Sequence, residues 1–270
     1  MNGRVLIIAG SDSGGGAGIQ ADIKAVTALG GYAMTAVTAL TAQNTEGVFG
    51  VHPVPPDFIA EQMRLVLRDI GADAVKIGML HSAAVIDAVA DTLEAEAPGV
   101  PLVLDPVMVA KGGATLLDPD AAVTLKRRLP ILASLLTPNL PEAAALTGLA
   151  ISDLDGMRHA ADMLLTLGAP AVLLKGGHLP SDTVVDLLTT PDRMVEMASP
   201  RIDTPHTHGT GCTLASAIAV GLAQGLPMET AVRRARAYVR TAIETAPGFG
   251  RGHGPLNHVH TVAPYVPDGA

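Results

Sequence analysis

The sequence of 270 residues is rich in aliphatic side chains and poor in aromatic ones. Hydrophobic residues make up 48% of the chain and aromatic residues only 2%, so few rings are present to stack on nucleic-acid bases. Twenty-six acidic residues outnumber 18 basic ones, and the net charge of −8 disfavours both nucleic acid and an anionic membrane surface as partners.

Targeting and disulfide signals are weak. The N-terminal apolar run of MNGRVLIIAGSD is too short for a signal peptide, and no run approaches the roughly 18 apolar residues of a membrane span. The single cysteine excludes an internal disulfide. These features predict a soluble, cytoplasmic protein.

Short apolar runs alternate with helical patterns through most of the chain, as in proteins that have a parallel sheet. We expect strands at 4–9, 34–42, 74–77, 101–104, 134–137 and 171–174, and helices at 19–29, 57–70, 82–96, from 118 with Pro119 at the first position, 153–168, 213–225 and 228–246. A hairpin is expected over 184–197. The pattern predicts one domain over residues 1–270, a three-layer α/β/α sandwich with a mostly parallel, doubly wound sheet.

A glycine-rich loop, Gly10 to Gly18, follows the first strand and precedes a helix. It lacks the Gly-Lys-Ser/Thr ending of a Walker A motif, and its spacing does not give a clean dinucleotide fingerprint. A flexible surface loop is one interpretation. The other is a ligand loop, because ligands bind at the carboxyl edge of such sheets.

The segment Thr207-His208-Gly209-Thr210-Gly211-Cys212-Thr213 places two glycines directly before a small-residue helix. Unpaired amides and the helix dipole make such a turn suited to an anion such as phosphate. Cys212 would lie in the first helical turn, where the same field is expected to lower its pKa. The alternative is an ordinary helix start that contains a small buried cysteine.

Polar side chains follow several expected strands. Gln43 offers both a donor and an acceptor and could bind a heterocycle, or it caps a loop. Asp105 could order a metal and its waters, or form a cap or ion pair. Asn139 and Glu142 have the spacing of a capping box and also of a metal and phosphate pair. Lys175, with two glycines behind it, could reach a phosphate.

These candidates share one edge of the predicted sheet, because they all follow the carboxyl ends of parallel strands. The set comprises the glycine-rich loop, Gln43, Met79, Asp105, Asn139, Lys175 and the turn at Gly209. Their common location favours a functional cleft over a series of unrelated structural features.

The motifs resemble those of the hydroxymethylpyrimidine and phosphomethylpyrimidine kinases of thiamine biosynthesis, in the ribokinase-like superfamily. The resemblance covers nearly the whole chain, in order. Its segments are AGSDSGGGAGIQAD (9–22), TALTAQNTEGV (38–48), KIGML (76–80), LDPVMVAKGG (104–113), LTPNLPEA (136–143), LLKGGH (173–178), THGTGCT (207–213) and GHGPLNH (252–258).

The resemblance implies phosphorylation of a pyrimidine hydroxymethyl group by ATP with Mg²⁺, followed by a second phosphorylation to the diphosphate. Cys212 would lie nearest the attacking hydroxyl, as base or positioner, and the amides of Gly209, Thr210, Gly211 and Cys212 would form an anion hole. The resemblance also implies a homodimer.

The same resemblance assigns residues to the ligands. Gln43, Asp22, Met79, Gly10 and Ala17 would bind the pyrimidine. Asp105 and Glu142 would order magnesium, and Lys175 and Asn139 would contact ATP.

Two other functions stay open at this point. A pyridoxal kinase of the same architecture would share the cysteine-containing turn, and Gln43 within AQNT favours the pyrimidine over it. A ligand-binding relative without catalysis is the second alternative, and the presence of Cys212, Lys175, Asp105 and Glu142 argues against it.

Overall fold

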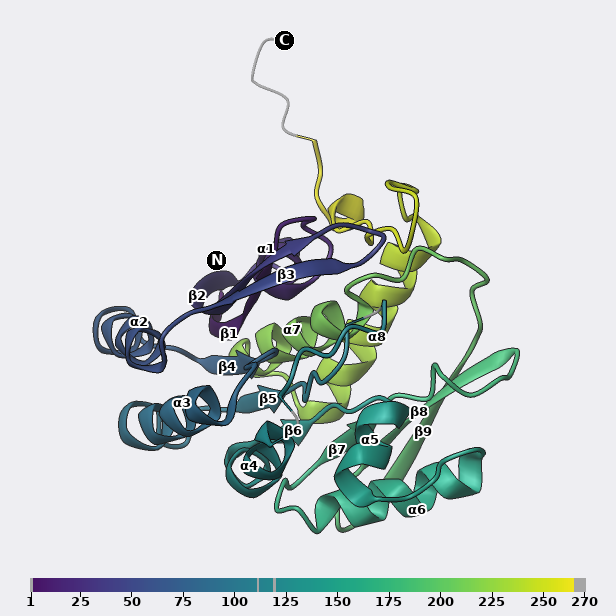
Figure 1. Ribbon diagram of the computed structural model, residues 1–270. Coiled ribbons are helices and arrows are strands. Elements are labelled where there is room, and N and C mark those ends of the chain that lie inside the picture. The colour runs from purple at the N-terminus through teal and green to yellow at the C-terminus, as the bar shows by residue number, and fades with distance from the viewer. Residues whose placement is uncertain (1, 111, 119, 265–270) are drawn as a thin grey trace.

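The computed structural model describes residues 2–110, 112–118 and 120–264. This part of the chain forms nine strands and eight α-helices, with two short 3₁₀ helices (Figure 1). The strands are β1 (Arg4–Asp12), β2 (Tyr32–Gln43), β3 (Val48–Pro53), β4 (Ala74–Ile77), β5 (Leu102–Leu104), β6 (Leu135–Leu136), β7 (Val172–Leu174), β8 (Thr183–Thr189) and β9 (Met194–Pro200). The helices are α1 (Gly18–Ala28), α2 (Pro56–Asp69), α3 (Ala83–Glu96), α4 (Ala121–Arg128), α5 (Leu140–Thr147), α6 (Leu154–Leu165), α7 (Thr210–Ala223) and α8 (Met228–Glu244), with η1 (Pro130–Leu132) and η2 (Val259–Thr261).

All nine strands belong to one sheet in the order β3-β2-β1-β4-β5-β6-β7-β8-β9. The strands from β2 through β7 in this order pair in parallel, and β3, β8 and β9 are antiparallel additions at the two ends. After β2 and β3 the chain returns across β1 to form β4, so the winding direction changes between β1 and β4. Ligands of open α/β sheets bind at such a change of direction.

Alternation of side chains along β1 shows how the sheet separates two cores. Leu6 and Ile8 face the core that α2 to α6 cover, whereas Val5 and Ile7 face the core of α1, α7 and α8. All four are completely buried. A strand that is buried on both faces has apolar residues at successive positions, and this pattern makes β1 easy to predict from the sequence. The predicted three-layer α/β/α fold is therefore confirmed (Figure 1).

The structure corrects several predicted element boundaries. Strand β3 was not predicted, and the helix expected to begin at Thr213 begins three residues earlier, at Thr210. The helix expected from Asp118 begins at Ala121, and its predicted first residue, Pro119, lies outside the described residues. The predicted hairpin is present as β8 and β9.

The chain after α8 crosses back over the loops at the carboxyl edge of the sheet (Figure 1, yellow). The backbone N–H of His253 donates to the carbonyl oxygen of Thr45 at 2.8 Å, and the N–H of His208 donates to that of Gly254 at 3.1 Å. These bonds tie the C-terminal segment to the loop after β2 and to the turn before α7.

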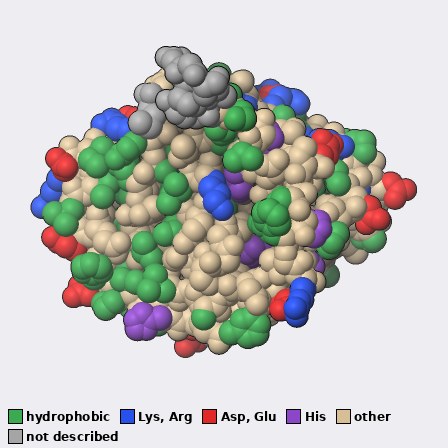
Figure 2. Space-filling model, turned by 90° about the horizontal axis from the view of Figure 1, so that it is seen from above, with side chains coloured by type: hydrophobic (Ala, Val, Ile, Leu, Met, Phe, Trp, Pro, Cys, Tyr) green, Lys and Arg blue, Asp and Glu red, His purple; other side chains and the backbone are tan. Residues whose placement is uncertain are grey.

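Charged and apolar side chains are both present on the surface of the molecule. On the face shown in Figure 2, charged side chains lie mostly around the rim and apolar ones lie between them. Among the described residues, none of the helices combines the length and the apolar character that crossing a membrane requires.

Candidate active site

A cleft of about 1130 Å³ runs along the carboxyl edge of the parallel strands. It begins at the end of β1, passes the ends of β2, β4, β5, β6 and β7, and is closed on one side by the first turn of α7. All but one of the predicted site residues line it: Gly10, Ala17, Gln43, Met79, Asp105, Asn139, Glu142, Lys175, Gly209, Thr210, Gly211 and Cys212. The exception is Asp22.

Two glycines, Gly209 in the turn before α7 and Gly211 in the first turn of α7, come close to other groups. Gly209 has φ +82°, and a Cβ there would collide with the backbone oxygen of Gly16. A Cβ on Gly211 would come within 3.3 Å of Lys175 Nζ and 3.5 Å of Asp105 Oδ2. The backbone at Gly211 is thus the surface that faces the lysine and the aspartate. The amides of Gly211 and Cys212 head the helix, where amides have no partner inside the helix.

The Thr210 amide differs from the expected arrangement of the anion hole. It contacts the carbonyl oxygen of Thr207 at 3.3 Å, and the Thr210 hydroxyl donates to the same oxygen at 2.8 Å. The turn is therefore closed on itself at Thr210. This leaves the amides of Gly211 and Cys212 as the better anion donors of the predicted set.

The prediction that the helix field lowers the pKa of Cys212 is wrong. Burial raises the pKa of the Cys212 thiol to about 11, and the nearby Lys76 offsets only part of that rise. The carboxyl groups of Asp22 and Asp105 contribute to the same rise in the pKa of Cys212. Desolvation of a thiolate therefore outweighs the helix dipole, and the thiol is protonated at neutral pH.

Asp22 does not line the cleft. It lies beneath the cleft, on the side of the sheet that α1, α7 and α8 cover. Its carboxylate oxygens accept hydrogen bonds from Lys76 Nζ at 2.9 and 3.0 Å and from Ser216 Oγ at 2.7 Å. Asp22 and Lys76 are both completely buried. Burial lowers the pKa of Lys76, but Asp22, Cys212 and Asp105 raise it more, so the lysine stays charged. The structure thus pairs Asp22 with a lysine instead of presenting it to a ligand.

Lys76 was not assigned a role from the sequence, although its strand was predicted. It follows Val75 in β4, and its side chain lies on the same side of the sheet as α1 and α7. It reaches the floor of the cleft. The available signal was a lysine within an otherwise apolar strand, because such a residue is almost never fully buried unless it is paired.

Asp105 and Lys175 form an ion pair in the wall of the cleft. Lys175 Nζ lies 2.9 Å from Asp105 Oδ1, and the Thr137 hydroxyl lies 3.2 Å from the same oxygen. Burial lowers the pKa of Lys175, but Asp105 and Glu142 raise it more. The lysine therefore keeps its charge, and its ammonium group lies close to the Gly211 backbone.

Asn139 and Glu142 form the capping box of α5. Asn139 Oδ1 accepts from the Glu142 amide at 2.9 Å, and Glu142 Oε2 accepts from the Asn139 amide at 2.7 Å. Both side chains also line the cleft. Burial raises the pKa of Glu142 to about 7, although Lys175 opposes the rise. The cap holds one carboxylate oxygen of Glu142 and orients the other.

Asp12, which was not predicted as a site residue, organises the glycine-rich loop. Its carboxylate accepts from the amides of Gly14, Gly16 and Ala17 at 2.7, 3.1 and 2.8 Å. Burial raises the pKa of Asp12, but its hydrogen bonds lower it more, so the pKa falls below the usual value. An aspartate that precedes a glycine run is a known turn former, which is the signal the sequence offered.

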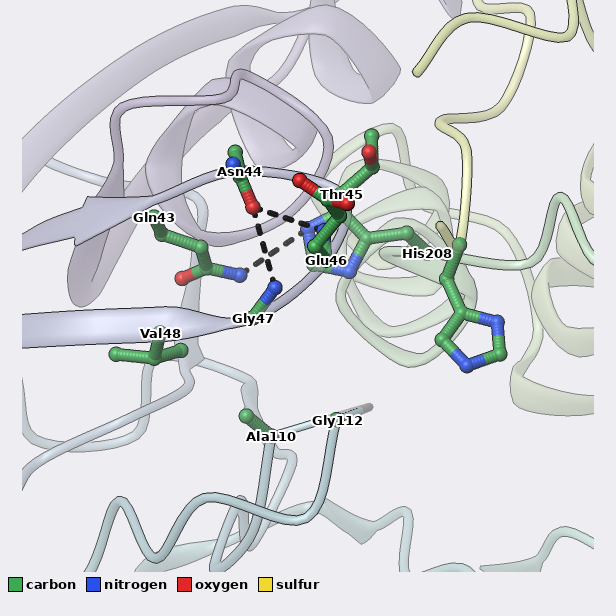
Figure 3. Close-up of a pocket in the computed structure, with 10 residues that line it drawn as sticks. Gln43, Asn44, Thr45, Glu46, Gly47, Val48, Ala110, Gly112 and His208 are labelled. Atoms are coloured by element: carbon green, nitrogen blue, oxygen red, sulfur yellow. Dashed lines mark hydrogen bonds between the residues drawn. The ribbon is translucent and has the colours of Figure 1, made fainter. Parts of the chain in front are cut away.

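Gln43 and Met79 both line the cleft, Gln43 at the end of β2 and Met79 just after β4. In Figure 3 the Gln43 carboxamide points to the ring of His208, and the two side-chain nitrogens are 3.2 Å apart. Gln43 Oε1 lies 3.2 Å from the Thr41 hydroxyl. A Cβ on Gly10 would come within 3.0 Å of Met79 Sδ, so glycine at this position leaves room for the methionine.

The donor set suits magnesium only if a ligand shares the coordination. Among the described residues, no three His, Cys, Asp or Glu side chains cluster as a metal cage. Asp105 Oδ2 is directed at the Gly211 backbone, and Glu142 lies close enough to Asp105 that the aspartate raises its pKa. Magnesium usually binds one or two carboxylates together with water and phosphate oxygens. Asp105 and Glu142 fit that pattern.

The sheet and the cleft together define a class of protein, the ribokinase-like kinases of small molecules. A helix N-terminus suited to phosphate faces a lysine and two carboxylates, and Gln43, a side chain able to bind a heterocycle, lines the same cleft. Phosphoryl transfer requires mainly alignment and charge neutralisation, which these groups supply.

Comparison with known proteins identifies the family. The family model described as phosphomethylpyrimidine kinase matches residues 12–257. The chain is 48% identical over 259 residues to the hydroxymethylpyrimidine/phosphomethylpyrimidine kinase of Haemophilus influenzae, with 94% of this chain and 96% of the relative covered. It is 56% identical over 257 residues to the thiamine biosynthesis bifunctional protein ThiED of Geobacter sulfurreducens, covering 95% of this chain and about half (52%) of that longer protein.

Solved structures agree with this result. A phosphomethylpyrimidine kinase from Clostridium difficile is 42% identical and superposes with a TM-score of 0.79, over 89% of this chain and 99% of that one. A Bacillus subtilis pyridoxal kinase in complex with ADP is 35% identical, with a TM-score of 0.88 over 96% and 98% of the two chains. The chain belongs to the phosphomethylpyrimidine kinase family.

Proposed function

We propose that this chain uses ATP to phosphorylate 4-amino-5-hydroxymethyl-2-methylpyrimidine and then converts the monophosphate to the diphosphate, in thiamine biosynthesis. The observation that carries the proposal is the placement of Gln43 in the same cleft as the Cys212 turn and Lys175. One end of the cleft can thus bind an aminopyrimidine while the other holds phosphate. The names of the Haemophilus influenzae and Clostridium difficile proteins support the same substrate class.

The substrate ring occupies the end of the cleft near β1 and β2 in this proposal. Gln43 pairs with the amino group and the ring nitrogen, because its carboxamide offers an acceptor beside a donor. Met79 packs on the ring, and Gly10 and Ala17 provide close backbone walls. Asp22 acts indirectly: it holds Lys76 under the cleft floor and does not touch the substrate.

Transfer of the phosphoryl group takes place at the first turn of α7. The amides of Gly211 and Cys212, with Gly209 and Thr210 shaping the turn, stabilise the charge of the transferred group. The Cys212 thiol is protonated at rest, so its role is to position the attacking hydroxyl and not to act as a resident thiolate base. No covalent intermediate on Cys212 is part of the proposal.

ATP phosphates lie against Lys175 and the Asn139 end of α5. Magnesium, held by Asp105 and Glu142 through its waters and by the phosphates, supplies charge neutralisation when bound. Lys175 adds a permanent positive charge next to Gly211. These residues orient the phosphates toward the hydroxyl near Cys212.

Pyridoxal kinase is the second candidate function. The superposition on the Bacillus subtilis pyridoxal kinase favours it, since the two chains share most of their length at 35% identity. Gln43 argues for the pyrimidine as the main substrate. The aldehyde beside the phosphorylated hydroxymethyl group of pyridoxal is an acceptor, whereas the pyrimidine has an amine donor there.

Three further proposals concern the whole molecule. Residues 1–270 form a single kinase domain, which the continuous nine-stranded sheet supports. The protein is cytoplasmic, in line with its acidic composition. It forms a homodimer, for which the outer strand β3 and the 74% exposed Phe49 on it offer a surface. Light scattering at several protein concentrations tests the dimer.

Product analysis tests the proposed reaction. We expect ATP, magnesium and the pyrimidine to yield first the monophosphate and then the diphosphate, both resolved by mass spectrometry and ³¹P NMR. A matched reaction with pyridoxal serves as the comparison. Consumption of ATP that does not depend on any added alcohol would contradict the proposal.

A further inference from the structure

His208 is the residue before Gly209, and its ring is held on several sides. Its backbone N–H donates to the carbonyl oxygen of Gly254, and its ring packs on Gly16, where a Cβ would collide with ring atom Cδ2. Its side chain is 10% exposed, and Nε2 lies 2.8 Å from Asp12 Oδ2. The ring therefore has one fixed position between the glycine-rich loop and the turn before α7.

The partners of Asp12 determine which ring atom carries hydrogen. Asp12 accepts three backbone hydrogen bonds in addition to its contact with His208, and its pKa lies below the usual value. The carboxylate is therefore ionised and can only accept. His208 Nε2 must then carry a hydrogen, whether the imidazole is neutral or charged.

The environment of Gln43 then determines which way its carboxamide faces. The Thr41 hydroxyl has a single hydrogen, and we assign it to the nearer acceptor, the carbonyl oxygen of Ser11 at 3.0 Å, over Gln43 Oε1 at 3.2 Å. Toward Gln43 the hydroxyl then only accepts. His208 Nε2–H can only donate. Gln43 Nε2 at 3.2 Å from His208 Nε2 would set two donors against each other. A rotation of the carboxamide by 180° brings Oε1 to His208 and Nε2 to Thr41. The single Nε2–H of His208 is then shared between Asp12 Oδ2, its nearer acceptor at 2.8 Å, and Gln43 Oε1 as the second acceptor of a three-centre bond, while Gln43 Nε2 donates to Thr41.

We propose that His208, held by Asp12, is a positioning residue for substrate selection: with Thr41, it fixes the carboxamide of Gln43 with Oε1 toward His208 and Nε2 toward Thr41. The remaining lone pair of Oε1 and the remaining N–H of Nε2 then face the cleft in a fixed order. A heterocycle that has an amine donor beside a ring acceptor matches this order in one orientation only. A heterocycle with two acceptors at these positions leaves one of them facing an acceptor.

This inference rests on the proposed function and deepens it. It predicts that removing the hydrogen bond from His208 lets the Gln43 carboxamide turn. Preference for the aminopyrimidine should then fall, because the wrong orientation presents acceptor to acceptor. ATP binding should change little, because the His208 ring contacts Asp12 and Gln43, whereas Lys175 pairs with Asp105.

A double-mutant cycle tests the proposal on the full-length enzyme. The variants are His208→Leu, Gln43→Ala and the pair, and the readout is kcat/KM for the hydroxymethylpyrimidine and for pyridoxal. We expect His208→Leu to lower the pyrimidine kcat/KM roughly 10-fold through KM, with a smaller loss for pyridoxal. In the Gln43→Ala background the same change should have little further effect on the ratio of the two substrates.

Two more variants complete the design. Thr41→Val removes the acceptor at the other end of the same carboxamide, together with the one hydrogen bond from Thr41 to the Ser11 carbonyl oxygen, and leaves the contacts of Asp12 and His208 in place. It should also lower the pyrimidine preference. His253→Leu, an exposed histidine on the C-terminal segment, is the matched control and should leave the preference unchanged. Thr41→Val gives the answer if His208→Leu does not fold.

Additive effects of His208→Leu and Gln43→Ala on the substrate ratio would overturn the inference, as would an unchanged preference in Thr41→Val. Failure of the proposed function looks different, because the unaltered enzyme would then turn over neither pyrimidine.

Discussion

Lys76 and Asp22 form an ion pair with both side chains completely buried, and the two carboxylate oxygens lie 2.9 and 3.0 Å from Nζ. Ser216 on α7 donates to the same carboxylate. The pair joins β4, α1 and α7 directly beneath the turn that contains Cys212. It therefore links the stability of the fold to the position of the anion site.

Removing one partner of this pair should destabilise the protein strongly. Lys76→Met leaves the Asp22 carboxylate buried without its counter-ion, and we expect a loss of about 3–5 kcal/mol in the free energy of unfolding. The double variant Lys76→Met with Asp22→Leu should recover much of that loss. Urea denaturation measures both, with the exposed pair Arg4 and Asp73 as the control. Equal losses in the single and double variants would show that the pair is not the cause.

Gly209 should be essential for turnover because of its backbone conformation. Gly209→Ala places a methyl group against the Gly16 oxygen at φ +82°, so the amides that follow must move. We expect kcat to fall ~100-fold or more, the order found when an anion-hole donor is lost. Gly225→Ala is the control, since Gly225 also has positive φ but open space around its Cβ position. Similar kcat losses in the two variants would point to backbone strain alone.

The Cys212 thiol should react slowly at neutral pH. Because its pKa is raised to about 11 from the usual value of about 8.5, alkylation by iodoacetamide should keep accelerating up to about pH 11. Cys212 is the single cysteine, so mass spectrometry reads its modification directly. A reaction rate that levels off below pH 8 would contradict this account and restore a thiolate base.

The raised pKa of Cys212 also makes the free energy of unfolding depend on pH in the alkaline range. The folded state holds the Cys212 proton more tightly than the unfolded chain, so this contribution is present below about pH 8.5 and is lost as pH rises toward 11. Cys212→Ser should flatten that part of the stability profile. Denaturation at several pH values between 8 and 11 compares the two proteins.

Magnesium binding should strengthen as pH rises through neutrality. Glu142 has a pKa of about 7, raised by burial, and only its ionised form can order a cation. We expect the magnesium concentration that gives half-maximal turnover to fall between pH 6 and 8. Glu142→Gln should need more magnesium at every pH and lose this dependence. A wild-type requirement that is constant across this range would exclude Glu142 from the metal site.

The raised pKa of Glu142 also makes the stability of the protein depend on pH when no magnesium is present. Because its folded pKa lies above the unfolded value, it stabilises the fold fully below about pH 4.3 and loses that contribution as pH rises through 7. Glu142→Gln should remove this slope in the absence of the metal. Thermal unfolding between pH 5 and 8 checks it.

The central strands could be predicted from the sequence because they are buried on both faces. Runs such as Arg4 to Ala9 and Ala74 to Ile77 are apolar throughout or nearly so, and β1 and β4 contain them. Strand β3 was missed because it lies at the edge of the sheet, contains Gly50 and Pro53, and has an exposed Phe49. Its position comes from pairing with β2, a tertiary contact that a local pattern does not report.

The cleft residues could be predicted for a related reason, since most of them directly follow predicted strands. Asp12 and His208 could not, because their roles depend on a contact between segments 196 positions apart. Asp22 was misplaced because a carboxylate next to a ligand loop and one that pairs with a buried lysine look the same in a sequence. The pKa of Cys212 was wrong because burial, which the sequence does not give, outweighs the helix dipole.

The measurement that tests the account most directly compares three substrates in a coupled ATP turnover assay with magnesium. The substrates are the hydroxymethylpyrimidine, its monophosphate and pyridoxal, each assessed by kcat/KM. The account predicts turnover of both pyrimidines, far above pyridoxal. Pyridoxal as the best substrate would contradict the role of Gln43 and move the enzyme to the second candidate function, and no turnover of any of the three would contradict the catalytic role of the cleft.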